Sequence, residues 1–553
     1  MKRVNFYIFL AVSVLSGASC GKDFLTVDRY DIIQPEELFN SEASIKKGLT
    51  GVYDMLYPDK KASSDIQQNW NFKPQMAFSN YPALDCQAMG WDNEFTRHDW
   101  RPDKDMFEIG WLNCYRGVDR ANRFIAKLKG ADLSVFSHGE TTKNIIMAEA
   151  RAIRGFFYYN LAQNFGRIPM LVEGETYSNT PNKARAATVE ETWRFIQDDF
   201  SYAADVLDWT PWNEEYGRVT KGMAKAYLAQ VYMYLNDFNS AKKELKDIID
   251  NQTYSLEPSY GTIHTENHWW GKESIFEVAF PDFDDMGWGA ADKTDALLWS
   301  SCLTASPTHG GWGALFISEE CVTSYEPGDK RRAYSIVAHG EVNPYTGQQM
   351  SDDLVISSEN MPNNSCLKWW KRILYTDKIY YSQSAVWMRY AAVLLNYAEC
   401  LFETVGDESD EDGNTGWDYL DMIRNRAWGN LEVEIQPQFP NEPVPFNATP
   451  VVVPDAESFY KNDPHFSSYT ADIKKVAVMN ERRHEFLAEY SFWYDLVRTG
   501  MAEEFLDKEY PMNSGTGTNR QFTFQSFRTL YPIPYLEIVR NSAIGPENQN
   551  PGY

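Results

Sequence analysis

Residues 144–165, NIIMAEARAIRGFFYYNLAQNF, decide the fold class of this chain. The segment carries two neighbouring apolar stripes at helical spacing, namely Ile146, Ala150, Ile153 and Phe157, and Ile145, Ala148, Ala152 and Phe156. Two adjacent stripes make a wide apolar face, which is typical of a helix packed between other helices. Gly166 and Pro169 end the pattern. The segment therefore predicts a mostly α-helical protein.

Similar periodicity predicts helices on both sides of this segment. They cover residues 35–57, 105–128, 188–207, 220–235, 240–249, 387–403, 416–426 and 473–497. The pair 220–235 and 240–249 has small alanines, a tyrosine and a short Asn236-Asp237 turn. These features resemble tetratricopeptide helix pairs, although the 34-residue consensus is degenerate.

Three long segments have a different composition. Residues 58–104, 251–386 and 430–468 are rich in Gly, Pro, Asp, Ser and aromatics and have few helical periods. Long irregular segments are usually functional or disordered, and many aromatics argue against disorder. We expect one domain over residues 20–553, with a helical scaffold mainly at 35–250 and 387–500 and an ordered, loop-rich, ligand-binding excursion mainly at 251–386.

The N-terminus is typical of an export signal. Lys2 and Arg3 precede an apolar run over residues 6–15, and the small residues 16–19 lead to Cys20. Ten apolar residues are too few to span a bilayer, so residues 1–19 are interpreted as a signal peptide. Cys20 resembles the lipidated cysteine of the bacterial lipoprotein box, with Gly17 where Leu is usual; an ordinary cleaved signal is the alternative. No later stretch has 18 uninterrupted apolar residues, so we expect the mature chain to be soluble apart from its lipid.

Charge and motif content exclude several classes of function. The 553 residues carry a formal net charge of −26, so nucleic acid and anionic membrane surfaces are disfavoured partners. The cysteines after Cys20 form no C-x-x-C pair, and the acidic run 407–412 lacks the EF-hand pattern, so it is interpreted as a solvated loop. We expect no metal and no cofactor. Motifs for serine hydrolases, zinc proteases, P-loops and dinucleotide folds are absent, and paired carboxylates are uninformative among 78 acidic residues, so no enzyme is predicted.

The eighteen tryptophans suggest a binding function. Half of them lie in two short stretches, Trp70, Trp91, Trp100 and Trp111, and Trp269, Trp270, Trp288, Trp299 and Trp312. Several are flanked by Gly and Asp, as in Gly90-Trp91-Asp92-Asn93, Gly287-Trp288-Gly289 and Gly311-Trp312-Gly313. Loop tryptophans of this kind present flat faces on which the C–H faces of sugars stack. The alternative is that they form the small cores of the loops.

Several motifs resemble the SusD/RagB lipoproteins of Bacteroidetes. They occur in order along the whole chain: Cys20 with Lys22-Asp23-Phe24-Leu25, Glu149-Ala150-Arg151-Ala152 with Gly166-Arg167-Ile168-Pro169, Arg389-Tyr390-Ala391 with Tyr397-Ala398-Glu399, Ile423-Arg424-Asn425-Arg426-Ala427, Glu481-Arg482-Arg483 with Asp495-Leu496-Val497-Arg498-Thr499-Gly500, and the ends Tyr531-Pro532-Ile533-Pro534 and Asn548-Gln549-Asn550-Pro551-Gly552-Tyr553.

This resemblance implies about four tetratricopeptide-like helix pairs with a loop-rich elaboration. It also implies a lipid-anchored, non-catalytic protein on the outer-membrane surface, which captures oligo- or polysaccharide for a SusC-like TonB-dependent transporter. Glu481, Arg482 and Arg483 would be scaffold residues that tie segments together.

Transferred by position, the resemblance places the glycan site at Trp91, Asp92, Asn93, Trp288 and Trp312. Asp85, Trp269, Trp270 and Trp299 are weaker candidates. Two other functions stay open at this point, namely a peptide-capturing member of the same family and a secreted glycoside hydrolase on a helical scaffold.

Overall fold

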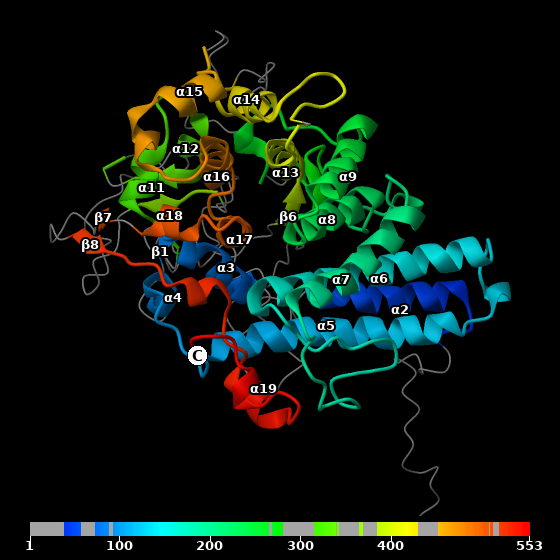
Figure 1. Ribbon diagram of the computed structural model, residues 1–553. Coiled ribbons are helices and arrows are strands. Elements are labelled where there is room, and N and C mark those ends of the chain that lie inside the picture. Colours follow the sequence, from blue (N-terminus) through cyan, green and yellow to red (C-terminus); the bar gives the residue numbers. More distant parts are fainter. Residues whose placement is uncertain are drawn as a thin grey trace, which may run out of the picture.

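Helix pairs form the scaffold of the computed structural model (Figure 1), and four of them lie within the described residues. The structure describes residues 38–56, 72–87, 92–264, 268–279, 315–338, 340–341, 364–368, 384–406, 408–429, 452–507, 509–511 and 519–553. The pairs are α2 (Glu42–Tyr53) with α5 (Asp105–Lys129), α6 (Glu140–Phe165) with α7 (Val189–Val206), α8 (Lys221–Tyr234) with α9 (Phe238–Asn251), and α13 (Tyr390–Glu403) with α14 (Gly416–Ala427). Each pair packs on the next through α5 and α6, α7 and α8, and α9 and α13. The predicted helical fold class is confirmed.

The helix boundaries follow local capping chemistry. Thr188 accepts a hydrogen bond from the backbone N–H of Glu191 at the start of α7, and Thr220 caps α8 in the same way through Met223. Asp237 caps α9, and Thr415 with Asp418 forms a capping box on α14. Such caps satisfy backbone N–H groups that the helix leaves unbonded. They place most helix starts within two residues of the predicted ones.

Helix α6 is buried on a wide face, as its two stripes predict. Phe156 and Phe157 are both less than 5% exposed, and Ile145 alone among the stripe residues is partly exposed. A Cβ atom on Gly117 of α5 would lie 2.3 Å from the Phe157 ring. Only glycine therefore lets α5 and α6 approach this closely.

Short elements order parts of the irregular segments. They are α3 (Phe72–Asn80), β1 (Cys86–Gln87), α4 (Asn93–Arg97), β2 (Ser274–Val278), β3 (Phe316–Ile317), α11 (Glu319–Ser324), α12 (Lys330–Ser335), β4 (Ile336–Val337), β5 (Ser365–Cys366), β6 (Ala385–Arg389) and α15 (Ala456–Asn462). The C-terminal part adds α16 (Ile473–Glu485), α17 (Phe492–Arg498), α18 (Ala502–Leu506), β7 (Glu509–Pro511), β8 (Asn519–Gln521) and α19 (Tyr535–Arg540). The strands form three small antiparallel sheets, β1-β3-β5-β4, β2-β6 and β7-β8.

Three predicted helix starts were wrong. Helix α6 begins at Glu140, four residues before the predicted residue 144. Helix α2 begins at Glu42, because Ser41 accepts the Ser44 backbone N–H as an N-cap. Helix α13 begins at Tyr390, since the preceding residues form strand β6 and pair with β2. Trp387 in this strand stacks on Tyr490 with ring centroids 4.5 Å apart, a contact that helical periodicity does not indicate.

The single helix predicted over 473–497 is two helices, α16 and α17. The break has a physical cause at Glu485, whose backbone carbonyl accepts hydrogen bonds from Tyr260, Lys368 and Arg389. Ala488 then adopts a left-handed backbone conformation with φ of 61°. Side chains from other segments thus take the place of the next helical turn.

Buried ion pairs hold the C-terminal end of α16. The Glu485 carboxylate binds Arg389 of β6 at 2.5 Å, Arg426 of α14 and Arg331 of α12, and all four side chains are almost completely buried. Burial alone would raise the pKa of Glu485, but Arg426, Arg389 and Arg331 together lower it to about 2. The ionised carboxylate is therefore the stable form in the native protein.

The neighbouring residues of α16 make equivalent contacts. Glu481 accepts a hydrogen bond from Arg424 at 2.8 Å and another from Tyr460 at 2.8 Å. Arg482 pairs with Glu399 of α13 at 3.0 Å, and Arg483 donates to Asp85 at 2.9 Å. The expected scaffold role of Glu481, Arg482 and Arg483 is confirmed, because each joins α16 to another segment.

Two further observations concern the described residues. None of their helices combines the length and the apolarity that a membrane crossing would require. Cys86, Cys114, Cys321, Cys366 and Cys400 carry free thiols, and burial raises the pKa of the Cys400 thiol inside α13. The predicted signal peptide and Cys20 lie outside the described residues.

We predict that Glu485→Gln lowers the free energy of unfolding by about 3–5 kcal/mol, because three buried guanidinium groups lose their shared carboxylate. Glu457→Gln is the matched control, since its pair with Lys461 is exposed on α15 and contributes at most about 0.5 kcal/mol. Guanidinium chloride unfolding of both variants tests this expectation. Equal stabilities of the two variants would contradict it.

Candidate functional site

The tryptophans that the sequence analysis ranked first are not described in the structure. Trp91, Trp288, Trp299 and Trp312 lie outside the described residues, so their contacts with a glycan stay predictions. Asp85, Asp92, Asn93, Trp269 and Trp270 are described. These five residues do not share one environment.

Asp85 is a structural residue of the interior. Its side chain is buried, and both carboxylate oxygens accept hydrogen bonds from the Arg483 guanidinium. Its backbone carbonyl accepts a hydrogen bond from the Ser318 N–H at 2.8 Å. A carboxylate that is buried and bound in this way cannot contact a glycan from solvent, which corrects the weaker prediction for Asp85.

Asp92 is also buried, at 1% exposed, and it precedes helix α4. Its carboxylate lies 3.6 Å from the Lys104 ammonium, which also pairs with Glu94 at 2.5 Å. Asn93, the first residue of α4, is only partly buried. Of these two predicted polar contacts, Asn93 is the one that solvent reaches, and Asp92 is bound to Lys104 in the interior.

Trp269 and Trp270 lie at the surface beside a tyrosine that the sequence analysis did not single out. Tyr216 is 69% exposed and Trp270 is 38% exposed. Their rings are 6.4 Å apart between centroids and inclined by 30°, and Trp269 meets Trp270 edge to face. We call Tyr216, Trp269 and Trp270 the aromatic platform. Gly217 directly follows Tyr216, and a neighbouring glycine was the criterion by which the loop tryptophans were selected. The same criterion applied to tyrosines would have selected Tyr216.

The platform is built on backbone conformations that residues other than glycine rarely adopt. Trp270 has φ of 51°, and Asn213 and Glu214 both have φ of 56° in the turn that precedes Tyr216. Positive φ at such residues costs free energy and persists where surrounding contacts enforce it. Strained backbone conformations of this kind cluster at functional sites, ligand clamps among them.

A buried carboxyl group holds the Trp270 turn. The Trp270 N–H donates to a Glu277 side-chain oxygen at 2.9 Å, and the Ser384 hydroxyl donates to the other oxygen. Glu277 lies in strand β2 and is 4% exposed. Burial raises the pKa of Glu277 to about 7, while the bonds from Ser274 and Trp270 oppose that shift. The base of the platform therefore contains a group that titrates near neutral pH.

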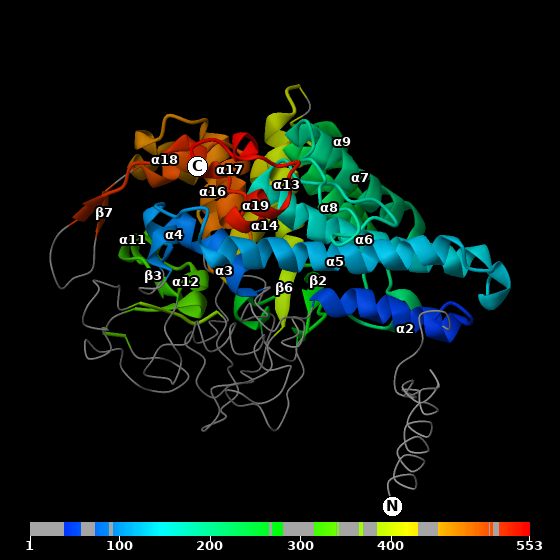
Figure 2. The same cartoon turned by 90° about the horizontal axis from the view of Figure 1, so that it is seen from below.

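A second set of contacts holds the Tyr216 turn against the helix pairs. Arg218 donates to Glu149 of α6 at 3.0 Å and also pairs with Glu215. The Tyr53 hydroxyl of α2 donates to the same Glu149 carboxylate at 2.5 Å. Burial raises the pKa of Glu149, and Arg218 acts against this effect. Figure 2 shows α2 and β2 on the same side of the molecule.

A tryptophan beside the platform is fixed by two cations. Trp212 has the Lys46 ammonium 4.2 Å and the Arg218 guanidinium 5.5 Å from its ring centroid. Cations over an aromatic ring stabilise its orientation. Trp212 thus belongs to the support of the Tyr216 turn.

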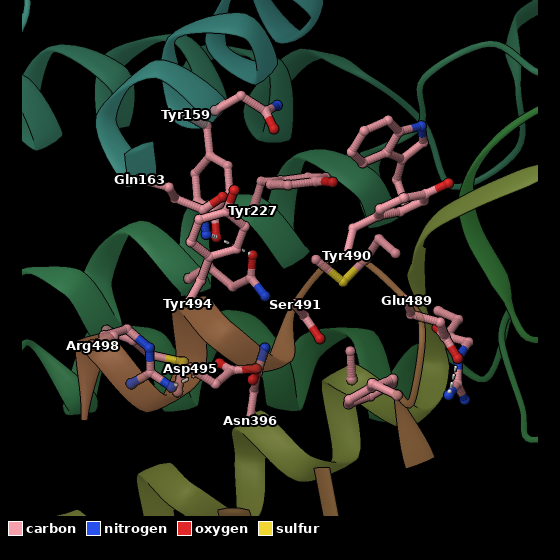
Figure 3. A pocket seen from close by; sticks show the side chains of 18 of the residues that line it. Tyr159, Gln163, Tyr227, Asn396, Glu489, Tyr490, Ser491, Tyr494, Asp495 and Arg498 are labelled. Atoms are coloured by element: carbon pink, nitrogen blue, oxygen red, sulfur yellow. Dashed lines mark hydrogen bonds and ion pairs between the residues drawn. The ribbon is translucent and has the colours of Figure 1, made fainter. Parts of the chain in front are cut away.

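A polar cavity lies elsewhere, between α6, α8, β6 and α17 (Figure 3). Its volume is about 50 Å³, which is room for roughly three to five water molecules. A sugar ring does not fit into a space of this size. Among the described residues, the exposed aromatic platform is therefore a better candidate for glycan contact than this cavity.

Comparisons with protein families match most of the chain. The model of the SusD family matches residues 272–553. A second model, described as starch-binding and associating with the outer membrane, matches residues 23–233. Among curated proteins, SusD-like protein P2 of Formosa agariphila is 25% identical over the full length of both chains. A SusD-like protein of Bacteroides ovatus is 21% identical, covering 89% of this chain and 81% of its own.

Solved structures share the fold. A SusD-like carbohydrate-binding protein of Bacteroides fragilis superposes with a TM-score of 0.69 at 19% identity, covering 92% of this chain and 99% of its own. Surface glycan-binding protein A of Bacteroides thetaiotaomicron, in complex with laminarihexaose, superposes with a TM-score of 0.65 at 21% identity, covering 92% and 99%.

We predict that Glu277 makes the stability of the protein depend on pH. Its native pKa of about 7 exceeds the ordinary value of 4.5, so its contribution is complete below about pH 4.5 and is lost as the pH rises to 7. Between pH 5 and pH 8 this loss is about 2–3 kcal/mol, and Glu277→Gln should remove it. Chemical denaturation at both pH values tests this, with Glu190→Gln on the exposed face of α7 as control. Parallel pH profiles of wild type and Glu277→Gln would contradict the assignment.

Proposed function

The chain belongs to the SusD family, and we propose that it is a non-catalytic, lipid-anchored glycan-binding protein of the outer-membrane surface. In this proposal it captures oligo- or polysaccharide and delivers it to a SusC-like TonB-dependent transporter. The observation that carries the proposal is the aromatic platform, which exposes two rings on enforced turns. Family membership makes a glycan the first ligand class to consider.

The platform chemistry suits a sugar chain. Sugar rings have apolar C–H faces that pack on exposed aromatic rings, and each such contact contributes about 0.5–1.5 kcal/mol. Trp91, Trp288 and Trp312, with Asn93 as a polar contact, are the further ligand contacts that the family resemblance predicts. A few contacts of this kind, after the costs of association, give dissociation constants of roughly micromolar to millimolar. Weak capture suits a protein that must release its ligand to a transporter.

The carboxyl groups beneath the platform have supporting roles. Glu277 accepts the Trp270 N–H and the Ser384 hydroxyl, and Glu149 binds Tyr53 and Arg218. Both are buried below the exposed rings. We therefore propose retention of the glycan without cleavage.

The net charge of the protein and the ligand of a structural neighbour guide the choice of glycans to test. A net charge of −26 repels strongly acidic polysaccharides over the Debye length of about 8–10 Å. A structural neighbour was solved with laminarihexaose, so this neutral β-glucan is the first ligand to test. Starch, xylan and mannan complete a neutral panel.

We predict that Tyr216→Ala and Trp270→Ala each weaken glycan binding by roughly 2- to 12-fold, the equivalent of one stacking contact. Trp91→Ala, Trp288→Ala and Trp312→Ala should weaken binding by a similar factor. Calorimetry of the chain from residue 21 onward measures these affinities, and chromatography of the incubated glycan measures cleavage. Tyr535→Ala is the control, because Tyr535 is 56% exposed on the separate helix α19.

The outcomes separate the alternatives. Saturable binding without cleavage that the platform variants weaken supports the proposal. Cleavage of a bound glycan would overturn it in favour of a glycoside hydrolase. Absence of binding across the panel would overturn glycan capture, and binding that no aromatic variant changes would overturn the site.

We also predict that Cys20 carries the lipid anchor. Cys20→Ala should move the protein from the membrane fraction to the soluble fraction of cells, because the signal would remain but the lipidated side chain would be lost. Cys114→Ala on α5 is the control. Membrane retention of Cys20→Ala would contradict lipidation at this residue.

A further inference from the structure

The polar cavity of Figure 3 contains hydrogen-bond donors that have no acceptor. Asn396 Nδ2, Arg482 Nε and Ser491 Oγ are buried and have no hydrogen-bond partner, and all three residues line the cavity. Asn396 and Arg482 are each 1% exposed. In Figure 3 the Ser491 hydroxyl points into the open space between the labelled side chains.

The remaining contacts of these groups fix their orientation. Asn396 Oδ1 accepts a hydrogen bond from Arg482 Nη2 at 2.5 Å, which turns the amide nitrogen of Asn396 away from the arginine. Arg482 also donates to Asp495 at 3.2 Å and to Glu399 at 3.0 Å through its two Nη atoms, and its Nε is left without an acceptor. Rotation of Asn396 would therefore break its hydrogen bond with Arg482, and rotation of Arg482 would break its ion pairs with Glu399 and Asp495.

Buried donors without an acceptor are costly, and native proteins pair nearly all of them with protein groups or ordered solvent. Three such donors around one cavity point to an occupant that offers lone pairs. The wall of the cavity also carries the cations Arg389, Arg482 and Arg498. A metal cation would meet these charges and the donor hydrogens, so an electron-rich species fits better.

The size of the cavity sets the class of occupant. About 50 Å³ accepts a monatomic ion or a few water molecules and excludes sugars and nucleotides. Asp495 and Glu489 also line the wall and limit the negative charge that the site tolerates. The occupant is thus small and carries at most one negative charge.

We propose that this cavity is a binding site for a small hydrogen-bond acceptor, a chloride ion or a cluster of ordered water molecules, held by Asn396, Arg482 and Ser491. The occupant joins α13, α16 and the start of α17. This junction is the place where α16 ends and α17 begins. The inference does not rest on the proposed glycan function, because the cavity and the aromatic platform share no residue.

The test uses the protein from residue 21 onward, crystallised in sodium bromide and measured at wavelengths around the bromine absorption edge. We expect density within hydrogen-bond distance of all three donors. Thermal unfolding is measured in parallel in sodium chloride and in sodium methanesulfonate at equal ionic strength. Ser491→Ala removes one donor, and Asn396→Asp replaces the amide donor by an acceptor of the same shape. Ser467→Ala, at an exposed site, is the control.

The measurements distinguish the two possible occupants, a halide ion and water molecules. A halide predicts an anomalous peak and a chloride-specific rise of the melting temperature on the order of 1 °C, which Asn396→Asp abolishes and Ser491→Ala reduces. Water predicts density without anomalous signal, equal melting temperatures in both salts, and an occupant that persists in Asn396→Asp because water also donates. An empty or closed cavity, or three donors bonded to protein groups, would overturn the proposal.

Discussion

The carboxylate of Glu485 and its three arginine partners are the interaction on which the C-terminal half of the structure depends. Arg331, Arg389 and Arg426 come from α12, β6 and α14, so one carboxylate fixes three segments that are distant in the sequence. Desolvation of these charges offsets much of their mutual attraction, but removal of one partner would leave the others buried and uncompensated. The backbone carbonyl of the same residue binds Tyr260, Lys368 and Arg389, so the cluster also determines where α16 ends.

The same cluster sets the position of the aromatic platform through strand β2. Glu273 pairs with both Arg389 and Arg426, and one of its oxygens accepts the Glu257 backbone N–H. Glu273 immediately precedes β2, and Trp270 lies three residues before Glu273. The ion cluster therefore holds one end of the turn that presents Trp270, and Glu277 within the strand holds the turn itself.

Helical periodicity predicted most of the scaffold, because α5, α6, α7, α8 and α14 bury apolar faces, and α7, α8 and α14 also carry side-chain caps. Periodicity failed where distant side chains decide the backbone. Trp387 fits a helical pattern but pairs in a strand, and Ala488 has no sequence signal for its positive φ. The scaffold role of the charged motif at 481–483 was predicted from the family resemblance and not from periodicity. Tyr216 was missed because the glycine-flanking signal was applied only to tryptophans, and Asp85 was misassigned because its partner Arg483 is 398 residues away.

Two independent supports meet at the platform, and this arrangement explains how exposed rings keep enforced conformations. Tyr216 is held by the helix pairs through Glu149 and Arg218, whereas Trp270 is held by β2 through Glu277. The contact between their rings is the point where the helical scaffold and the ion-paired C-terminal half meet at the surface. A change in either support shifts one ring relative to the other. The spacing of the two rings therefore depends on both supports. The affinity of a ligand that contacts both rings depends on how the helical scaffold and the ion-paired half pack together.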